Sequence, residues 1–209
     1  MQIYKDLEQW TTEWLDIRKA TITWTKLKGV SWWPKAQKTE LYTLLAEQFI
    51  QEEEGLSARE IIDRWHILEP IAKAKYQEMT GHNVEEVWFI KKEEWLGLSP
   101  DGIIEVWWKY RRAVEIKCPM GKNFMKYLIE NKIPDEYFKQ VIHYFIVMDE
   151  LEKLDFVIFH PGVSGDVPML HIVKVTRAEL EDDIIKHKEK LQSFKRQWDI
   201  LKTQLWERT

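Results

Sequence analysis

The spacing of apolar residues alternates between helical and extended patterns along the chain. Leu41, Leu45 and Phe49 recur four residues apart, with Leu44 between them, which is typical of one buried helix face. The pattern predicts a helix over residues 39–53, and a glycine shortly afterwards marks its end.

A second helix is predicted from Ser57 to Thr80. Ser57 is a favourable N-cap, and Glu60 stands at the third position after it, as in a capping box. Gly81 then closes the helix. Pro70 lies inside this span, so a kink or a break into two helices is expected.

The middle of the chain changes to short runs rich in β-branched and aromatic residues, separated by turn residues. The expected strands are Val84–Ile90, Glu94–Leu98, Ile103–Trp108, Ala113–Lys117, Phe156–Phe159 and Leu170–Val175. Between the fourth and fifth, helical spacing returns over Phe138–Met148.

A long charged helix is predicted at the C-terminal end, reaching about Trp206, because Thr176 and Glu179 form a capping box. This order of elements indicates a mixed α/β domain. We expect one domain over residues 1–209, with a helical part to about 81, a sheet part over about 84–175 and a terminal helix over about 177–206.

Composition narrows the class of protein. The 209 residues, 44% hydrophobic and 32% charged, suit one globular domain and exclude global disorder. No apolar run is long enough to cross a membrane, and the start of the chain lacks a signal-peptide pattern. The one cysteine, Cys118, excludes an intrachain disulfide and four-thiolate metal sites. A cytosolic protein without a membrane partner is expected.

The net charge of −4 conceals an uneven distribution. Residues 18–38 hold six basic and no acidic residues, and residues 109–139 hold eight basic and four acidic ones. Several of the 12 tryptophans lie in or beside these stretches, an arrangement that suits nucleic-acid binding by phosphate neutralisation and base stacking. Solvated lysines with tryptophans in the core or a subunit interface are the alternative.

The candidate chemistry lies in Ser99-Pro100-Asp101-Gly102 and Glu115-Ile116-Lys117. Glu115 and Lys117 are two apart on a strand and share a face, while the turn presents Asp101 at a strand start. Carboxylates that hold Mg²⁺, with an ammonium that orients water, suit metal-assisted phosphodiester hydrolysis. Glu115-Ile116-Lys117 alone would also fit an exposed strand carrying a charge pair.

The hairpin between Asp101 and Glu115 has two possible registers. Pairing these two acids places the tip at Trp108, where no glycine eases the turn. A tip at residues 110–111 pairs Glu115 with Val106 instead, and a bulge could reconcile the two.

These motifs, with Tyr137-Phe138-Lys139-Gln140, resemble those of the YqaJ-type viral recombinases in the PD-(D/E)XK nuclease superfamily. Other segments fit the family in the same order. They are Trp14-Leu15-Asp16-Ile17-Arg18, Thr23-Trp24-Thr25, Tyr42-Thr43-Leu44-Leu45-Ala46-Glu47 and Leu68-Glu69-Pro70. The resemblance implies a restriction-endonuclease-like core, with a central mixed sheet flanked by helices.

The resemblance also implies site residues. Asp101, Glu115 and the Ile116 carbonyl would bind Mg²⁺, for which Mn²⁺ would substitute, and Lys117 would position the attacking water. Glu69 would complete the carboxylate set, and Gln140 would orient water or the scissile phosphate. Arg18 and Thr25 would recognise a 5′-terminal phosphate, which a guanidinium can bind through two hydrogen bonds.

Three of these residues have other interpretations. Glu69 could be a first-turn carboxylate of a helix, Gln140 a polar boundary residue, and Arg18 a partner of Glu13 or Asp16. The chain also departs from the family pattern at two positions, with Ile142 where a second glutamine is frequent and Trp65 where a glycine is usual. Its hairpin between Asp101 and Glu115 is longer than that of the best-known family member and carries Trp107-Trp108-Lys109-Tyr110-Arg111-Arg112. These residues suggest an added contact with DNA or a neighbouring subunit.

The resemblance therefore implies a metal-dependent 5′→3′ exonuclease acting on double-stranded DNA ends in the bacterial cytosol. It would be encoded by a phage or prophage, form a homotrimeric ring, and pass 3′ single strands to an annealing protein in recombination. Another PD-(D/E)XK endonuclease and a catalytically silent DNA-end-binding or recombinase-docking module are the alternatives. A Cas4-like nuclease would need a four-cysteine cluster, which one cysteine excludes.

Overall fold

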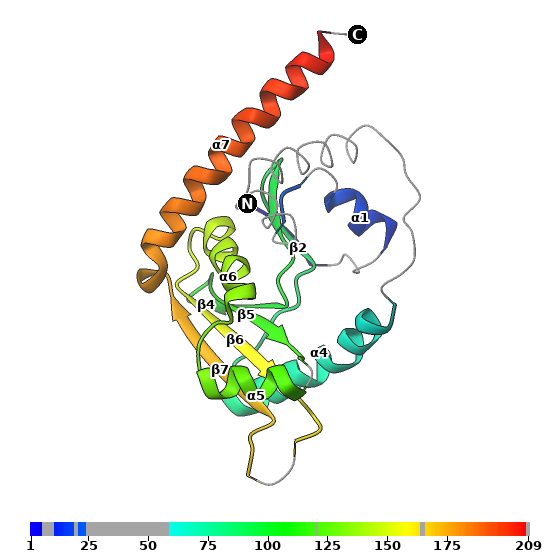
Figure 1. Cartoon of the computed structure of the whole chain (residues 1–209), viewed down its shortest axis with the longest axis vertical. Helices are drawn as coiled ribbons and strands as arrows, with labels where there is room; N and C mark the ends of the chain where they lie inside the picture. Colours follow the sequence, from blue (N-terminus) through cyan, green and yellow to red (C-terminus); the bar gives the residue numbers. More distant parts are fainter. Residues whose placement is uncertain (6–10, 19–20, 24–58, 120, 164–165, 208–209) are drawn as a thin grey trace.

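The computed structural model describes residues 1–5, 11–18, 21–23, 59–119, 121–163 and 166–207 (Figure 1). The helices are α1 (Thr12–Arg18), α4 (Arg59–Thr80), α5 (Gly121–Glu130), α6 (Asp135–Val147) and α7 (Glu181–Trp206), with a one-turn helix η1 (Ala178–Leu180). The strands are β1 (Gln2–Tyr4), β2 (Phe89–Glu93), β3 (Leu96–Leu98), β4 (Gly102–Val106), β5 (Lys109–Lys117), β6 (Lys153–Phe159) and β7 (Leu170–Thr176). The helix predicted over 39–53 lies outside the described residues.

The centre of the fold is a mixed sheet in the order β4-β5-β6-β7. Its β5–β6 pair is parallel, while the two outer pairs are antiparallel. Strands β1, β2 and β3 form a smaller antiparallel sheet. Helices α5 and α6 pack on one face of the central sheet and α4 on the other (Figure 1). This arrangement, together with the long helix α7, confirms the predicted fold class.

Helix α4 continues without a break from Arg59 to Thr80, so the break expected at Pro70 is wrong. Its last two turns are held against the sheet by Ala72 and Tyr76, both fully buried, which compensates for the hydrogen bond that a proline cannot donate. As predicted, Gly81 ends the helix. It adopts a φ of +69°, and its N–H donates to the Gln77 carbonyl over 2.8 Å.

The segment before β2 is less regular than its β-rich sequence predicts. Regular pairing begins only at Phe89, and the backbone of residues 84–88 pairs with the central sheet through a single bridge between Glu85 and Ile103. Val84 packs directly over Gly102, where an added Cβ would come within 2.2 Å of the valine Cγ1. Gly102 therefore permits close packing at the start of β4, in addition to following the turn.

The structure selects the hairpin register that brings Asp101 opposite Glu115. Gly102 pairs with Val114, and a bulge after Ile104 shifts the last pairs towards the tip. Trp107 and Trp108 form the turn with φ values of 54° and 63°, so the strand predicted to reach Trp108 ends at Val106. Left-handed backbone costs a bulky residue roughly 1–2 kcal/mol, so turns of this kind usually carry Asn or Gly and a Trp-Trp pair does not indicate one.

Besides the one-turn helix η1, three elements were not predicted, namely α1, β1 and α5. Strand β1 pairs with β2 through Ile3 and Ile90, and at three residues it is too short to give a periodic signal. Helix α5 does carry a signal, since Phe124, Tyr127 and Leu128 lie three and four residues apart and pack into the core. It completes the crossover between the parallel strands β5 and β6.

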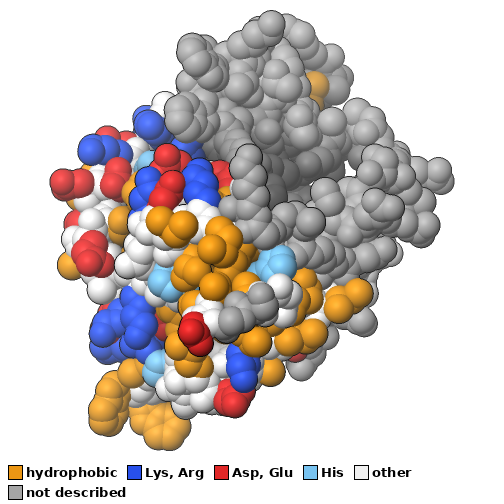
Figure 2. Space-filling model, turned by 60° about the horizontal axis from the view of Figure 1, so that its bottom comes forward, with side chains coloured by type: hydrophobic (Ala, Val, Ile, Leu, Met, Phe, Trp, Pro, Cys, Tyr) orange, Lys and Arg blue, Asp and Glu red, His pale blue; other side chains and the backbone are white. Residues whose placement is uncertain are grey.

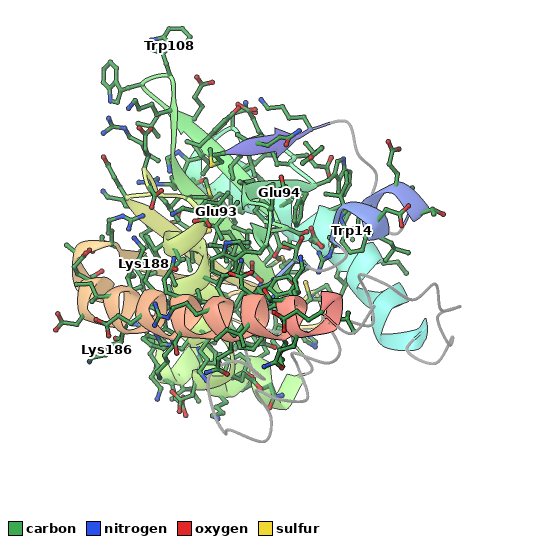
Figure 3. The ribbon with its side chains drawn as sticks, turned by 90° about the horizontal axis from the view of Figure 1, so that it is seen from above. Trp14, Glu93, Glu94, Trp108, Lys186 and Lys188 are labelled. Carbon is green, nitrogen blue, oxygen red and sulfur yellow. The ribbon has the colours of Figure 1, made fainter. Side chains whose placement is uncertain are left out.

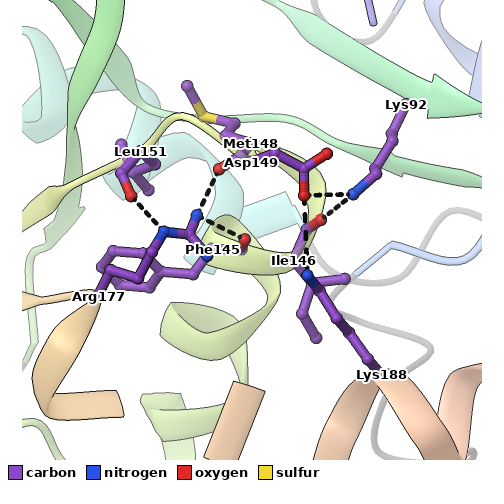
Figure 4. Close-up of polar contacts among 8 residues, drawn as sticks. All are labelled: Lys92, Phe145, Ile146, Met148, Asp149, Leu151, Arg177 and Lys188. Atoms are coloured by element: carbon purple, nitrogen blue, oxygen red, sulfur yellow. Dashed lines mark hydrogen bonds and ion pairs between the residues drawn. The ribbon is translucent and has the colours of Figure 1, made fainter. Parts of the chain in front are cut away.

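Helix α6 is buried from Gln140 to Val147, and Arg177 secures its C-terminal end (Figure 4). The guanidinium donates to the carbonyls of Phe145, Met148 and Leu151 at 2.8–2.9 Å. Because these carbonyls lack partners within the helix, one arginine fixes the helix end and the loop after it. The residue that follows η1 begins α7, and the capping box of Thr176 and Glu179 forms as predicted.

On the face shown in Figure 2, basic and acidic side chains lie side by side around an area of hydrophobic side chains. The strongly basic stretch over residues 24–38 lies outside the described residues, as does Thr25. None of the described helices combines the length and the hydrophobicity that crossing a bilayer requires.

Candidate active site

Glu115 is the centre of a buried polar cluster at one end of the β4–β5 pair. It lies on β5 and is fully buried. Lys117 Nζ and Gln140 Nε2 both donate to its Oε1, and the Tyr144 hydroxyl donates to its Oε2 over 2.5 Å. The strand therefore supplies Glu115 and Lys117 from one face, while α6 supplies the amide and the phenol.

Asp101 joins this cluster from the turn before β4. Its Oδ2 accepts the Ile116 N–H over 2.7 Å, and its carboxyl group lies within hydrogen-bonding reach of Glu115. The Asp101 N–H donates to the Tyr144 hydroxyl over 3.3 Å. The hairpin register thus brings together the acids that the sequence left in two alternative positions.

Glu69 approaches the cluster from α4, on the other side of the sheet edge. Its Oε1 lies 4.0 Å from Lys73 Nζ. Burial and the nearby Asp101 carboxylate raise the pKa of Glu69 from 4.5 to about 8, and Lys73 offsets this only in part. The Glu115 carboxylate also raises the pKa of Glu69, and the Lys117 ammonium lowers it.

The cluster carries more negative than positive charge. Burial and repulsion from Asp101 raise the pKa of Glu115 to about 7, and burial also raises that of Asp101. For Lys117, burial opposes the charged form, but attraction to Glu115 and Asp101 outweighs it and the pKa is raised. Three acids whose ionisation is disfavoured therefore face two ammonium groups, that of Lys117 within the cluster and that of Lys73 beside Glu69. A divalent cation would favour the ionised form of these acids.

The donor chemistry of this cluster fits a hard cation. Carboxylate oxygens and a backbone carbonyl are the ligands that Mg²⁺ prefers. Gln140 Oε1 is buried and has no hydrogen-bond partner among the described residues, so an oxygen acceptor also remains for a bound water. Within the described ranges, no group of three His, Cys, Asp or Glu side chains has the spacing of a metal site. A bound cation would compete with the donors that now occupy the Glu115 oxygens.

Arg18 lies beside the cluster at the C-terminal end of α1. Its guanidinium donates to Ser99 Oγ over 2.6 Å and lies 4.2 Å from the ring centroid of Trp14. Ser99 is two residues before Asp101, so Arg18 contacts the turn that carries this acid. Recognition of a 5′-phosphate by Arg18 stays a prediction. Thr25 lies outside the described residues.

Tyr144 and Tyr137 are site residues that the sequence analysis missed. Tyr144 fell within the helix predicted over Phe138–Met148 and was given no role, although a position four residues after Gln140 lies on the same helix face. The Lys117 ammonium lies 5.1 Å from the ring centroid of Tyr137, within cation–π range. The alternative interpretation of Gln140 as a boundary residue is wrong, because its side chain is buried and bonded to Glu115.

Cys118 and His143 lie near the cluster without entering it. Cys118 is buried in the core on the α4 side, as expected for a small structural residue. His143 Nε2 contacts the Gly97 carbonyl at 2.8 Å, and burial lowers the pKa of the imidazole to about 4. Its neutral ring therefore connects α6 to β3.

The model of the YqaJ-like viral recombinase domain family matches residues 13–150. This span contains every candidate site residue and exceeds half of the chain. A comparison with curated protein sequences gives no significant match.

Solved structures of exonucleases share the fold. The alkaline exonuclease LHK-Exo from Laribacter hongkongensis is 23% identical, with a TM-score of 0.75 over 95% of this chain and 100% of that chain. Its complex with dAMP gives a TM-score of 0.73, at the same identity and coverage. A phage related exonuclease from Haemophilus somnus 129PT is 13% identical, with a TM-score of 0.58 over 92% of this chain and 95% of that one.

Proposed function

We propose that this chain, which belongs to the family of YqaJ-like viral recombinase domains and is a nuclease, degrades one strand of duplex DNA from its 5′ end in a Mg²⁺-dependent reaction. The observation that carries the proposal is the buried cluster of Asp101, Glu115 and Lys117, in which the acids exceed the basic charge. The 3′ single strands left behind would serve recombination by annealing.

The residues that would hold the cation are Asp101, Glu115 and the Ile116 carbonyl, with Glu69 contributing through a second ion or a metal-bound water. When bound, Mg²⁺ acidifies the attacking water and neutralises charge on the phosphate. Mn²⁺ would substitute, since it accepts the same oxygen ligands.

The protein's own groups would position the water and stabilise the transition state. Lys117, held on the face that presents Glu115, donates hydrogen bonds to the attacking water and offsets charge on the phosphate oxygens. Gln140 has a free amide oxygen within the cluster that can accept from the same water. Tyr144 holds Glu115 and the Asp101 backbone together, so the carboxylates keep their relative positions.

Recognition of the DNA end would fall to Arg18, with Thr25 as a second contact. The guanidinium lies beside Ser99, two residues from Asp101, and can bind a 5′-phosphate through two hydrogen bonds. LHK-Exo, which shares the fold, has been solved in complex with dAMP, a nucleoside monophosphate of the kind that exonucleolytic cleavage releases. If Arg18 binds the phosphate, wild-type protein digests 5′-hydroxyl ends more slowly than 5′-phosphorylated ends, and Arg18→Ala removes the difference. Equal wild-type rates on both ends would remove this assignment.

The same proposal includes a homotrimeric ring around the DNA, an annealing protein as partner, and a phage or prophage gene product acting in the bacterial cytosol. A ring reconciles DNA binding with the net charge of −4, because only the channel needs to be basic.

The test is digestion of duplex DNA labelled at either end, with Mg²⁺, with Mn²⁺ and with a chelator. We expect mononucleotides from the 5′ end, no product with chelator, and no product from Asp101→Ala. Covalently closed circles are the control substrate, and their cleavage would indicate an endonuclease instead. If the wild type binds ends but degrades nothing in the presence of Mg²⁺, the chain is a DNA-end-binding module.

A further inference from the structure

Two tryptophans at the tip of the β4–β5 hairpin are exposed in an unfavourable backbone conformation. Trp107 and Trp108 have 83% and 90% of their surface exposed, and both have positive φ. A two-residue turn with this backbone suits Asn-Gly, which adopts it with little strain. Figure 3 shows Trp108 projecting beyond the body of the molecule. Neither indole gains burial within one copy of the chain to compensate for the strain.

A hollow lies directly beside this tip. It has a volume of about 570 Å³ and is lined by apolar and aromatic residues that include Trp108, Tyr110, Val147 and Met148. Charged residues from β2, from the start of β5 and from the loop after α6 complete the lining. This volume falls within the range of cavities that bind small organic groups, so it can receive an indole. The surface thus carries an aromatic projection and an adjoining hollow.

The charges around the tip are paired with one another. Lys109 Nζ lies 2.6 Å from Glu150 Oε1, and Arg111 Nη1 lies 2.5 Å from Glu152 Oε1. Lys92 Nζ lies 2.7 Å from Asp149 Oδ1 (Figure 4). A DNA-binding surface needs basic groups available for phosphates, and here carboxylates occupy them. A balanced surface favours a protein partner, and a projection next to a hollow is complementary to a second copy of itself.

We propose that the hairpin tip is a self-association surface, at which two copies pair about a two-fold axis and each places an indole in the hollow of the other. Tryptophans that become buried at the centre of an interface are frequent sources of binding energy. The apolar area that the indoles expose in one copy would then be covered.

This contact is separate from the candidate active site. Five strand residues, from Gly102 to Val106, lie between Asp101 and the tip, which places the two about 20 Å apart along the strand. The pairing is therefore independent of the proposed nuclease activity, and it adds a two-fold contact to any ring that the chain forms.

The test compares the wild type with the double variant Trp107→Asn, Trp108→Gly by sedimentation equilibrium over a range of protein concentrations. We expect the variant to have half the mass of the wild-type assembly, a trimer from a hexamer or a monomer from a dimer. Because Asn-Gly relaxes the turn, its thermal unfolding midpoint, measured where the protein is dissociated, should not fall. Ile129→Ser, which removes an exposed apolar side chain from α5, is the matched control and should leave the mass unchanged.

An unchanged mass in the double variant, or a wild type that stays monomeric at every concentration, overturns the proposal. A fall to one third would indicate that the tip belongs to the ring contact and would overturn the two-fold pairing. Loss of DNA binding at an unchanged mass would identify DNA as the partner. If the double variant does not fold, Trp107→Ser and Trp108→Ser are compared singly with the wild type. At least one of them should halve the mass, because one of the two indoles enters the hollow, and an unchanged mass in both overturns the proposal.

Discussion

Replacing Tyr144 with phenylalanine removes one oxygen from the centre of the candidate active site. The ring stays packed in the core, so the change affects chiefly two hydrogen bonds. Glu115 Oε2 loses the 2.5 Å bond from the hydroxyl, and the Asp101 N–H loses its acceptor at 3.3 Å. Both losses fall on residues that we propose as ligands of the cation.

The magnitude follows from burial. A hydrogen bond to a charged group contributes about 1.5–3 kcal/mol, and a carboxylate oxygen left without its donor in a buried site loses most of that. Groups that hold a metal ligand in place typically change metal affinity by about 10- to 100-fold when removed. We therefore expect Tyr144→Phe to weaken Mn²⁺ binding by about tenfold or more and to raise the Mg²⁺ concentration needed for half-maximal hydrolysis.

Tyr76→Phe is the matched control. The Tyr76 hydroxyl is buried and donates to the buried carboxylate of Asp155 over 2.5 Å, in the core on the α4 side of the sheet. Each variant loses one 2.5 Å hydrogen bond from a buried phenol to a buried carboxylate, and Tyr144→Phe also loses the longer bond from the Asp101 N–H. Both should therefore lower the free energy of unfolding by about 1–3 kcal/mol. Only Tyr144→Phe should change Mn²⁺ affinity, measured by isothermal titration calorimetry. Equal Mn²⁺ affinities in both variants and the wild type would refute the positioning role.

Three further predictions test the site and the fold. Lys117→Ala should abolish hydrolysis while duplex ends still bind in a gel-shift assay with Ca²⁺, and an unchanged rate would contradict the water-positioning role. Below about pH 6.5 the lowered pKa of buried His143, about 4, makes stability rise with pH and opposes the effect of the acids. In chelator, the free energy of unfolding should therefore fall between about pH 6.5 and pH 8, because raised pKa values, about 8 for Glu69 and about 7 for Glu115, keep protons on the folded protein that the unfolded chain has lost. Thermal melts at stepped pH check this, and a midpoint that rises over that window would contradict it. Gly102→Ala should cost about 1–3 kcal/mol in urea unfolding by overpacking, with partial recovery when Val84→Ala is added.

The regular elements were largely predictable from the sequence. The period of the apolar residues and the capping residues identified α4, α6 and α7, because those helices pack one face or their whole surface into the core. The helix-breaking effect of Pro70 was overestimated, since packing on the sheet outweighs one missing hydrogen bond. Strand ends at Phe89 and Val106 depended on tertiary pairing, which local propensity does not encode.

The main residues of the candidate site could be predicted from the sequence, but their spatial arrangement and hydrogen bonds could not. Motif spacing identified Asp101, Glu115 and Lys117, whereas their juxtaposition depends on a register that the sequence left open. Two left-handed tryptophans are a rare solution to a hairpin turn, and no local signal favours them. The role of Tyr144 could not be predicted, because a tyrosine on the apolar face of a helix resembles an ordinary core residue in the sequence. Only the hydrogen bond from its hydroxyl to Glu115 distinguishes it.

The β4–β5 hairpin carries the candidate active site at one end and the proposed association surface at the other. At the first end the register places Asp101 opposite Glu115, and at the other the bulge after Ile104 lets a two-residue turn close the strands. An Asn-Gly turn would close the same register with less strain, so the active-site geometry does not require tryptophan at the tip. The register does not require Trp107 and Trp108, and their side chains stay exposed within one copy of the chain. A contact with a second copy accounts for their presence. The conformational strain at Trp107 and Trp108 is therefore physical evidence for association, separate from the evidence for catalysis.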